Sequence, residues 1–293
     1  MDITLSQAKS LIETQFPQLR PLHLTFLGKG WDNVVFEVNT QYVFRFPCHE
    51  KAVRVLQQEA LILKQLQDQV PALPLKTPQP VFSGQANGEY PYAFVGYTRV
   101  SGQTVCQRSI PFGMRRGWVE PLATFLRLLH PLPLIAERVE TPLHLTLIVD
   151  YHRALLRHEK GLRAQGLLPE FVCERIHAFE PAALQVPEPL VTVHGDLYAR
   201  HLIVDAQNAL TGCIDWGGVH RGHRAMDLSI AYSALSAEDR DLFFASYGEV
   251  SDTVRELSEF LALCCTLNLL TYALAVHDDP LKREMLAVLQ HLE

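Results

Sequence analysis

The chain has 293 residues, 48% of them apolar and 20% charged, a composition typical of a soluble globular protein that is long enough for two lobes. Its formal net charge of −6 argues against a general nucleic-acid binder, because such proteins usually carry a basic face. The first residues show no basic segment followed by an apolar one, which predicts a cytoplasmic protein without a secretory signal.

The cysteines and the apolar stretches point away from an extracellular or membrane setting. The six cysteines form no CxxC pair and have no regular spacing, so we expect reduced thiols and no zinc site. The longest apolar stretch, residues 260–276, is interrupted by Thr266, Asn268 and Thr271, which predicts a buried helix. We expect no nucleic-acid partner, no membrane partner, and a monomer or a weak dimer.

The first hundred residues combine helical and strand-like patterns. The spacing of apolar residues predicts helices over 5–15 and 51–67. Runs of β-branched and aromatic residues predict strands over 24–27, 33–38 and 42–46, and the last two form a hairpin.

A proline-rich segment follows the second of these helices. The prolines from Pro71 to Pro80 predict a loop. Residues 90–100 then predict a pair of strands that ends at Ser101-Gly102.

The remainder of the chain is mainly helical. Apolar stripes predict helices over 118–130, 145–165 and 169–179, and helical patterns return from Asp227 onward. We therefore predict an α+β fold with a small β-rich lobe over residues 1–99 and a larger, mainly helical lobe over 100–293.

Two glycines mark the first candidate site, in Gly28-Lys29-Gly30-Trp31-Asp32-Asn33. Glycines let a turn pass close over phosphate groups and leave backbone N–H groups free to donate to them. In the Gly-x-Gly-x-x-Gly pattern of nucleotide-binding loops, the third glycine would stand at the position of Asn33. Gly28, Gly30 and Asn33 are therefore phosphate-binding candidates, and a plain hairpin turn is the alternative.

A strand cation and a helix acid form the second candidate. Arg45 lies in the third predicted strand and Glu59 in the following helix, where an ion pair between them could hold nucleotide phosphates. The alternative for Glu59 is a solvated charge on the helix surface.

Asp196 and Asp215 carry the strongest chemical pattern. Asp196 follows His194-Gly195, and His201 lies five residues after it. Asp215 follows nineteen residues after Asp196, behind the strand-like run 202–204. Phosphoryl transfer needs this layout: one carboxylate for the acceptor hydroxyl and two ligands for Mg²⁺. A His ligand is unusual for Mg²⁺, so His201 binds through nitrogen, acts through water, or shapes the loop.

These segments resemble the catalytic core of the aminoglycoside phosphotransferase family, whose members are relatives of the protein kinases. The resemblance rests on His194-Gly195-Asp196, the residue five positions later, and Ile214-Asp215-Trp216. Gly30-Trp31-Asp32-Asn33 and Phe44-Arg45-Phe46-Pro47 are most similar to the branch of aminoglycoside 2''-phosphotransferases and macrolide phosphotransferases. That branch also places His at the position of His201. The resemblance covers residues 20–275.

The resemblance implies a protein-kinase-like fold that transfers the γ-phosphate of ATP or GTP to a hydroxyl group with Mg²⁺, in a setting of antibiotic resistance. It makes Asp196 the catalytic residue, and His201 and Asp215 the metal ligands. It places a hinge at residues 97–102, where backbone groups of Thr98 and Val100 would bind the nucleobase. It also implies that Asp227 supports the catalytic loop from below.

The resemblance places the acceptor in the second lobe, opposite Asp196. Acidic groups there suit a polyamine such as an aminoglycoside, although the acids after Ser236 also fit the first turn of a helix. Alternative acceptors are a macrolide, an amino alcohol or a sugar, and the other class of function is a nucleotide-binding pseudokinase. The candidate acceptor residues are Tyr198, Arg200, Trp216, Tyr232, Glu238 and Asp239.

Overall fold

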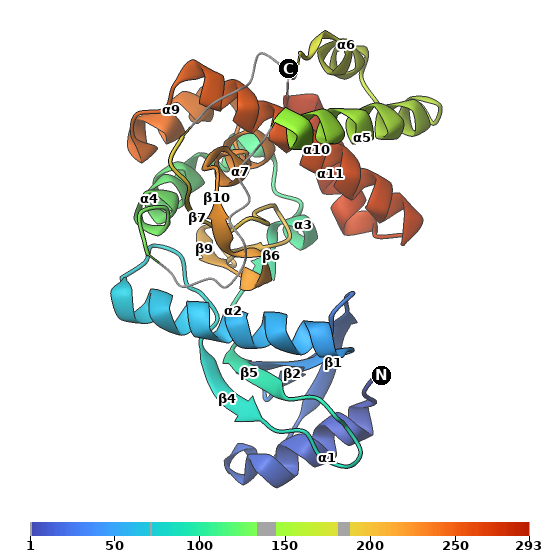
Figure 1. The fold of residues 1–293 in the computed structure, drawn as a ribbon, viewed down its shortest axis with the longest axis vertical. Coiled ribbons are helices and arrows are strands. Elements are labelled where there is room, and N and C mark those ends of the chain that lie inside the picture. Colours follow the sequence, from blue (N-terminus) through green and yellow to red (C-terminus); the bar gives the residue numbers. More distant parts are fainter. Residues whose placement is uncertain (1, 71, 134–144, 181–187, 293) are drawn as a thin grey trace. The chain divides into compact units, whose positions relative to one another are not determined.

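The computed structural model describes residues 2–70, 72–133, 145–180 and 188–292, and the chain divides into two compact units. The first unit contains the residues up to Ala72 together with Lys76–Ser101. The second contains Leu73–Leu75, Gly102–Pro133 and the described residues 145–180 and 188–292. Each unit has its own set of secondary-structure elements (Figure 1).

The first unit is built around a five-stranded antiparallel sheet in the order β1-β2-β3-β5-β4. Its elements along the chain are α1 (Leu5–Gln15), the 3-10 turn η1 (Pro17–Leu19), β1 (Leu24–Lys29), β2 (Asn33–Val38), β3 (Tyr42–Pro47), α2 (Glu50–Gln69), β4 (Pro80–Gly84) and β5 (Phe94–Thr98).

Successive side chains of β3 point to opposite faces of this sheet. Phe44 and Phe46 are fully buried in an apolar cluster that includes Leu11 and Ile12 of α1. The side chain between them, Arg45, points to the other face and reaches Glu59 of α2. Because successive strand residues face opposite sides, α1 and α2 cover opposite faces of the sheet (Figure 1).

The prediction of two strands within residues 90–100 is wrong. Only β5 forms there, because Asn87 and Tyr90 close a turn in which the Asn87 side chain accepts the Tyr90 N–H at 2.9 Å. The partner strand is β4, at the end of the segment predicted as a loop. Pro80 begins this strand, and a strand at the edge of a sheet tolerates proline. Pro71 lies outside the described residues.

The second unit is mainly helical, with two small antiparallel sheets, β10-β7 and β6-β8-β9. Its helices are α3 (Val105–Arg108), α4 (Val119–Leu129), α5 (Leu145–Arg163), α6 (Glu170–Ala178), α7 (Ala225–Leu228), α8 (Ile230–Ala234), α9 (Ala237–Tyr247), α10 (Asp252–Ala275) and α11 (Asp279–His291). Its strands and 3-10 turns are β6 (Gln103–Thr104), η2 (Phe112–Met114), η3 (Arg116–Trp118), β7 (Val191–Val193), β8 (Leu202–Val204), β9 (Leu210–Cys213), η5 (Trp216–Gly218) and β10 (His220–Gly222).

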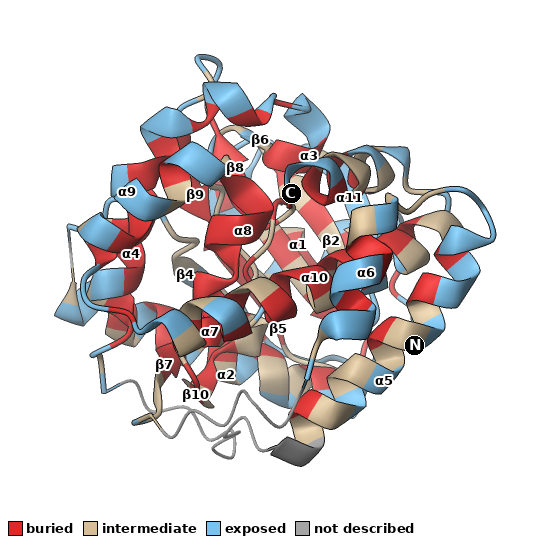
Figure 2. Cartoon of the chain, turned by 90° about the horizontal axis from the view of Figure 1, so that it is seen from above, coloured by how far each residue is buried: buried red, intermediate tan, exposed pale blue. Residues whose placement is uncertain are grey.

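The helix α10 forms the centre of this unit and contains the apolar stretch noted in the sequence. It packs against α5, α7, α8 and α11, and all five residues of α8 are buried (Figure 2). Among the described residues, α10 alone is long and apolar enough to cross a membrane, and 56% of its most apolar window is buried inside the protein. Its apolar length therefore serves the core of this unit.

Candidate active site

Asp196 lies in the loop between β7 and β8, and Asp215 directly follows the hairpin of β8 and β9. The strand β10 brings the two segments together, because it pairs antiparallel with β7 through Val193 and His220. Local strand pairing therefore places the loop of Asp196 beside the chain that follows Asp215.

Two glycines let these segments touch through their backbones. Gly195 has a φ of +78°, and a Cβ atom there would lie 2.7 Å from the Gly218 carbonyl oxygen. A Cβ atom on Gly218 would lie 2.9 Å from the His194 carbonyl oxygen. Sequence analysis assigned no role to Gly218, although its position in Asp215-Trp216-Gly217-Gly218 is the signal that could have identified it.

We expect Gly195→Ala to destabilise the protein more than Gly166→Ala does. Both glycines have a positive φ, but a Cβ atom on Gly166 would meet nothing within 4 Å. Each variant loses about 1 kcal/mol for a left-handed alanine. Gly195→Ala loses about 2 kcal/mol more for the steric contact with Gly218. Urea denaturation measures both losses, and equal losses would contradict the close approach.

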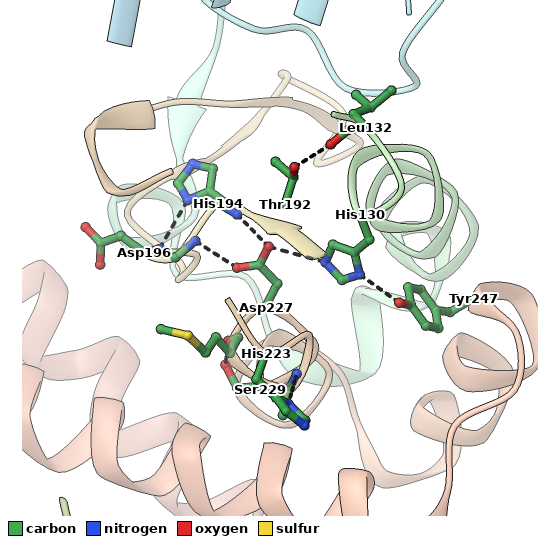
Figure 3. Close-up of polar contacts among 12 residues, drawn as sticks. His130, Leu132, Thr192, His194, Asp196, His223, Asp227, Ser229 and Tyr247 are labelled. Atoms are coloured by element: carbon green, nitrogen blue, oxygen red, sulfur yellow. Dashed lines mark hydrogen bonds and ion pairs between the residues drawn. The ribbon is translucent and has the colours of Figure 1, made fainter. Parts of the chain in front are cut away.

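Asp227 holds the loop of Asp196 from within the core (Figure 3). Its carboxylate is fully buried and accepts the backbone N–H groups of His194 at 2.6 Å and Gly195 at 2.9 Å. The Nε2 atom of His130 lies 3.4 Å from the same carboxylate. Burial alone would raise the pKa of Asp227, but the hydrogen bond from His130 and the backbone N–H of Gly195 hold that pKa below its ordinary value.

The end of α4 is tied to the strand that leads into the loop. The Thr192 N–H donates to the His130 carbonyl oxygen at 3.1 Å, and the Thr192 hydroxyl donates to the carbonyl oxygen of Leu132 (Figure 3). Thr192 thus fixes β7 against the same helix end that supplies His130. Sequence analysis missed Thr192, because a threonine in a strand carries no distinguishing signal.

His194 links the two aspartate segments. Its ring is buried, with Nε2 lying 3.2 Å from the Ile214 carbonyl oxygen and Nδ1 lying 3.3 Å from the Asp196 backbone N. A neutral ring that donates from Nε2 and accepts at Nδ1 satisfies both contacts. Burial lowers the pKa of His194, which favours this neutral form. His194 therefore braces the loop.

His201 and Asp215 face each other in a way that fits a cation. The Nδ1–H of His201 donates to the Asp196 carbonyl oxygen at 2.7 Å, which leaves the lone pair on Nε2. That Nε2 atom lies 3.5 Å from Asp215 Oδ2. Asp215 has a φ of +63°, a strained backbone of the kind found at functional sites.

The protein groups at this position do not form a metal site by themselves. Among the described residues, no three His, Cys, Asp or Glu side chains are grouped so that they could hold a metal ion. Mg²⁺ usually keeps several waters and binds one or two carboxylates together with phosphate oxygens. Asp215 and His201 fit that incomplete type of site.

Asp196 is the exposed acid of the loop. Its side chain is 54% exposed, and its Oδ2 atom lies 3.6 Å from His201 Nδ1. Desolvation of its enclosed side raises the pKa of Asp196 above its ordinary value, and the imidazoles of His201 and His194 act against that rise. An exposed carboxylate held by a rigid loop can reach the hydroxyl group of a bound molecule.

The phosphate-binding candidates lie in the first unit. Gly28 and Gly30 are in or next to β1, and a Cβ atom on either would meet nothing within 4 Å, so packing does not require glycine at these positions. The Arg45 Nη1 atom lies 2.7 Å from both carboxylate oxygens of Glu59, which is 2% exposed. Asn33 is buried at the start of β2.

The hinge candidates differ in how their backbones are used. The Thr98 N–H donates to the Gln79 carbonyl oxygen at 2.8 Å, and its hydroxyl oxygen accepts the Gln79 N–H at 3.0 Å. Val100 follows the end of β5. Because Thr98 is engaged within the sheet, we retain Val100 as the stronger candidate for binding a nucleobase.

Three of the acceptor candidates lie in the segments around Asp196 and Asp215. The Tyr198 ring lies 4.3 Å from the His201 ring, and Arg200 forms an ion pair with Asp278. Trp216 is fully buried, and its Nε1–H donates to the Cys213 carbonyl oxygen at 3.2 Å. We therefore correct the prediction for Trp216: it packs the core and presents no polar group to an acceptor.

The other three acceptor candidates lie on α8 and α9. Tyr232 is buried, and Arg240 stacks over its ring at 5.2 Å. Glu238 and Asp239 occupy the first turn of α9 after its N-cap, Ser236, which is the alternative noted in the sequence. Asp239 is 3% exposed and accepts from Ser236 at 2.8 Å and Arg116 at 3.3 Å. This buried carboxylate supports its own helix, so we also correct its assignment.

The fold is kinase-like. A unit built on a β-sheet contains an Arg–Glu ion pair, and the helical unit that follows it carries two aspartates in loops. A sequence model described as the phosphotransferase enzyme family matches residues 23–260. The chain therefore belongs to this family, as the sequence motifs predicted.

Comparison with individual proteins agrees with this membership. An aminoglycoside 3'-phosphotransferase of Escherichia coli is 27% identical over 183 residues, which are 57% of this chain and 62% of the relative. The match thus spans less than two thirds of that protein.

Solved structures confirm the predicted α+β kinase-like fold. The GDP complex of wild-type aminoglycoside 2'-phosphotransferase-IIIa is 22% identical, with a TM-score of 0.66 over 99% of this chain and 98% of that one. The apoenzyme of macrolide 2'-phosphotransferase MphH from Brachybacterium faecium is 17% identical, with a TM-score of 0.61 over 96% and 98%. At these identities the likeness shows the fold.

Proposed function

We propose that this protein is a Mg²⁺-dependent small-molecule O-kinase that transfers the γ-phosphate of ATP or GTP to a hydroxyl group of an aminoglycoside-like acceptor. We further propose a cytoplasmic enzyme, monomeric or weakly dimeric, that has neither a nucleic-acid nor a membrane partner. Membership of the phosphotransferase enzyme family supports the reaction class.

The arrangement of Asp196, His201 and Asp215 carries this proposal. Asp196 is exposed on a loop whose backbone is held by Asp227, so its carboxylate is positioned before an acceptor arrives. It orients the acceptor hydroxyl and takes its proton as the phosphoryl group is transferred. Catalysis of this kind depends on positioning more than on covalent chemistry.

Asp215 and His201 would hold Mg²⁺ at the nucleotide phosphates. The lone pair of His201 Nε2 faces Asp215 Oδ2 at 3.5 Å, and the hydrogen bond from His201 to the Asp196 carbonyl oxygen fixes the ring. When bound, the metal neutralises charge on the phosphate oxygens. A His at this position requires the ion to rely on water and phosphate for its remaining oxygen ligands.

The first unit would bind the nucleotide. Glu59 holds the Arg45 guanidinium at 2.7 Å, and the positive charge fixed there can attract nucleotide phosphates. Gly28, Gly30 and Asn33 would cover the phosphates, and Val100, with Thr98 as the weaker candidate, would bind the base. Because the structural neighbour aminoglycoside 2'-phosphotransferase-IIIa binds GDP, we keep GTP beside ATP as a candidate donor.

We expect Arg45→Lys to raise the KM for the nucleotide about tenfold, equivalent to ~1.4 kcal/mol, with a smaller change in kcat. Lysine keeps the charge but loses the planar fork that can bond Glu59 and a phosphate together. Arg163→Lys is the matched control, because Arg163 forms an ion pair with Glu170 on the second unit at 2.7 Å. Steady-state kinetics with varied nucleotide decide the result, and an unchanged KM in Arg45→Lys would remove the phosphate clamp.

The acceptor class is inferred from a sequence relative. The relative from Escherichia coli is an aminoglycoside 3'-phosphotransferase, which favours an aminoglycoside-like acceptor. Two acceptor candidates, Trp216 and Asp239, are set aside because they are buried. Tyr198 and Arg200 in the loop after Asp196 and the exposed Glu238 remain candidates. Only a small fraction of Tyr232 is exposed.

A phosphorylation screen tests the function. The purified protein is incubated with Mg²⁺ and either ATP or GTP, together with aminoglycosides, macrolides, amino alcohols and sugars. Nucleoside diphosphate release that depends on an aminoglycoside supports the full proposal. Turnover only with another acceptor replaces the substrate class and keeps the kinase. Nucleotide binding without transfer to any acceptor in the panel would support a pseudokinase instead.

A further inference from the structure

We propose that Tyr247 is a positioning residue for Asp196, because it fixes the tautomer of His130 and thereby the hydrogen bonds that hold the catalytic loop. Tyr247 lies 117 residues from His130 in the sequence, at the end of α9, and nothing in the local pattern marks it. This inference rests on the proposed phosphotransferase function for its kinetic consequence, but not for its structural one.

The contacts form one connected path in the second unit (Figure 3). The Tyr247 Oη atom lies 2.7 Å from His130 Nδ1, and His130 Nε2 lies 3.4 Å from Asp227 Oδ2. Asp227 then accepts the N–H of Gly195, the residue that precedes Asp196. Tyr247, His130 and Asp227 are 8%, 3% and 0% exposed, so solvent cannot replace these bonds.

The hydrogen-bond donors and acceptors that each side chain offers determine which group donates in each contact. Asp227 already accepts two backbone N–H groups and, as a carboxylate, can only accept from His130. His130 therefore donates from Nε2, and in a neutral ring its Nδ1 then accepts. The one proton of the Tyr247 hydroxyl fills that position.

Arg224 places a cation near the Tyr247 hydroxyl, where its charge acts to lower the pKa of Tyr247, although burial raises that pKa overall. Both oxygens of Glu188 hold the Arg224 guanidinium at 2.7 Å. A chain of polarised bonds runs from Tyr247 through His130 and Asp227 to the backbone beside Asp196.

Loss of the Tyr247 hydroxyl would leave His130 Nδ1 buried without its donor. The ring could then take up the other tautomer, in which Nε2 no longer donates to Asp227. The carboxylate would lose one of its three donors, and the backbone at Gly195 would become less fixed. A small displacement of a catalytic group lowers turnover more than binding of the nucleotide.

The first test observes the tautomer directly. Nitrogen-15 NMR of the wild-type protein at neutral pH, with the His130 signals assigned from the spectrum of His130→Gln, should show a neutral ring protonated at Nε2. A ring protonated at Nδ1, or one protonated at both nitrogens, would overturn the proposal. This readout does not depend on any enzymatic activity.

The second test uses Tyr247→Phe, with Tyr90→Phe as the matched control. Tyr90 is also a buried tyrosine whose hydroxyl donates to a backbone carbonyl, that of Pro47, in the first unit. In Tyr247→Phe we expect kcat to fall roughly tenfold with the nucleotide KM within about twofold of wild type. We also expect the amide protons of His194 and Gly195 to exchange roughly tenfold faster. Tyr90→Phe should change neither quantity.

Equal turnover and equal amide exchange in Tyr247→Phe and Tyr90→Phe would overturn the positioning role. If the wild-type protein transfers no phosphate to any acceptor, the proposed function fails. The tautomer and the exchange rates then still decide whether Tyr247 holds the loop.

Discussion

Replacement of Asp196 by asparagine is expected to lower kcat by about a thousandfold while nucleotide binding stays nearly unchanged. The amide keeps the size of the carboxylate but can neither take the proton of the acceptor hydroxyl nor carry its charge. The side chain is 54% exposed, so the exchange should leave folding stability close to that of wild type. Steady-state kinetics and nucleotide titration measure the two effects separately.

Asp205→Asn is the matched control for this prediction. Asp205 lies in the turn between β8 and β9, where its Oδ1 atom accepts the N–H groups of Gln207 and Ala209, each at 2.9 Å. Asparagine can make the same bonds in such a turn, so this variant should retain wild-type turnover. Full activity in Asp196→Asn would remove Asp196 from the catalytic role.

Replacement of Asp227 by asparagine is expected to lower the free energy of unfolding by about 3 kcal/mol and to reduce kcat as well. The fully buried carboxylate accepts from His194, Gly195 and His130, and an amide offers one acceptor oxygen in place of two. Asp252→Asn, in the exposed first turn of α10, should change stability little. Thermal or urea denaturation of the two variants measures the difference, and equal losses would contradict the support given by Asp227.

The same residue sets a pH dependence. The pKa of Asp227 in the folded state lies below its ordinary value of 3.8, so the unfolded state binds the proton first as the pH falls. The stabilisation by Asp227 is therefore complete above that ordinary value and is lost as the pH falls through the lower, folded pKa. Unfolding measured from pH 6 down to pH 3 should show a shallower acid loss in Asp227→Asn than in the wild-type protein.

His194 makes the stability of the fold depend on pH in a second, less acidic range. Burial lowers its pKa from 6.5, so the unfolded state takes up a proton first and stability decreases as the pH falls below that value. The two pH ranges differ because Asp227 is stabilised as an anion and His194 as a neutral ring.

The fold was predictable where local chemistry decides it. The hairpin of β2 and β3 and the helices α2 and α4 follow from residue spacing alone, because one face of each is apolar. The edge strand β4 was not predictable, since Pro80 at its start is a signal for a loop in a sequence without tertiary context. The misplaced pair at residues 90–100 has a different cause, because the turn closed by Asn87 and Tyr90 occupies the start of that segment.

The candidate site was predictable only in its short-range part. Asp196, His201 and Asp215 lie within twenty residues and keep a spacing that chemistry demands. The contacts of Tyr247 with His130 and of Gly195 with Gly218 join residues far apart or lacking a distinctive side chain. Trp216 and Asp239 were wrongly predicted to contact the acceptor, because their residue types suggest a function. Both are buried in the structure, which the sequence does not show, and they support packing.

The support of the loop through backbone amides has a consequence for engineering. Asp227 binds the N–H groups of His194 and Gly195, which every residue except proline provides. Between Asp196 and His201, Leu197 and Ala199 are buried, whereas Tyr198 and Arg200 are partly open to solvent. On the proposed acceptor assignment, a library restricted to positions 198 and 200 should therefore alter acceptor preference and leave the Asp196 carboxylate in place.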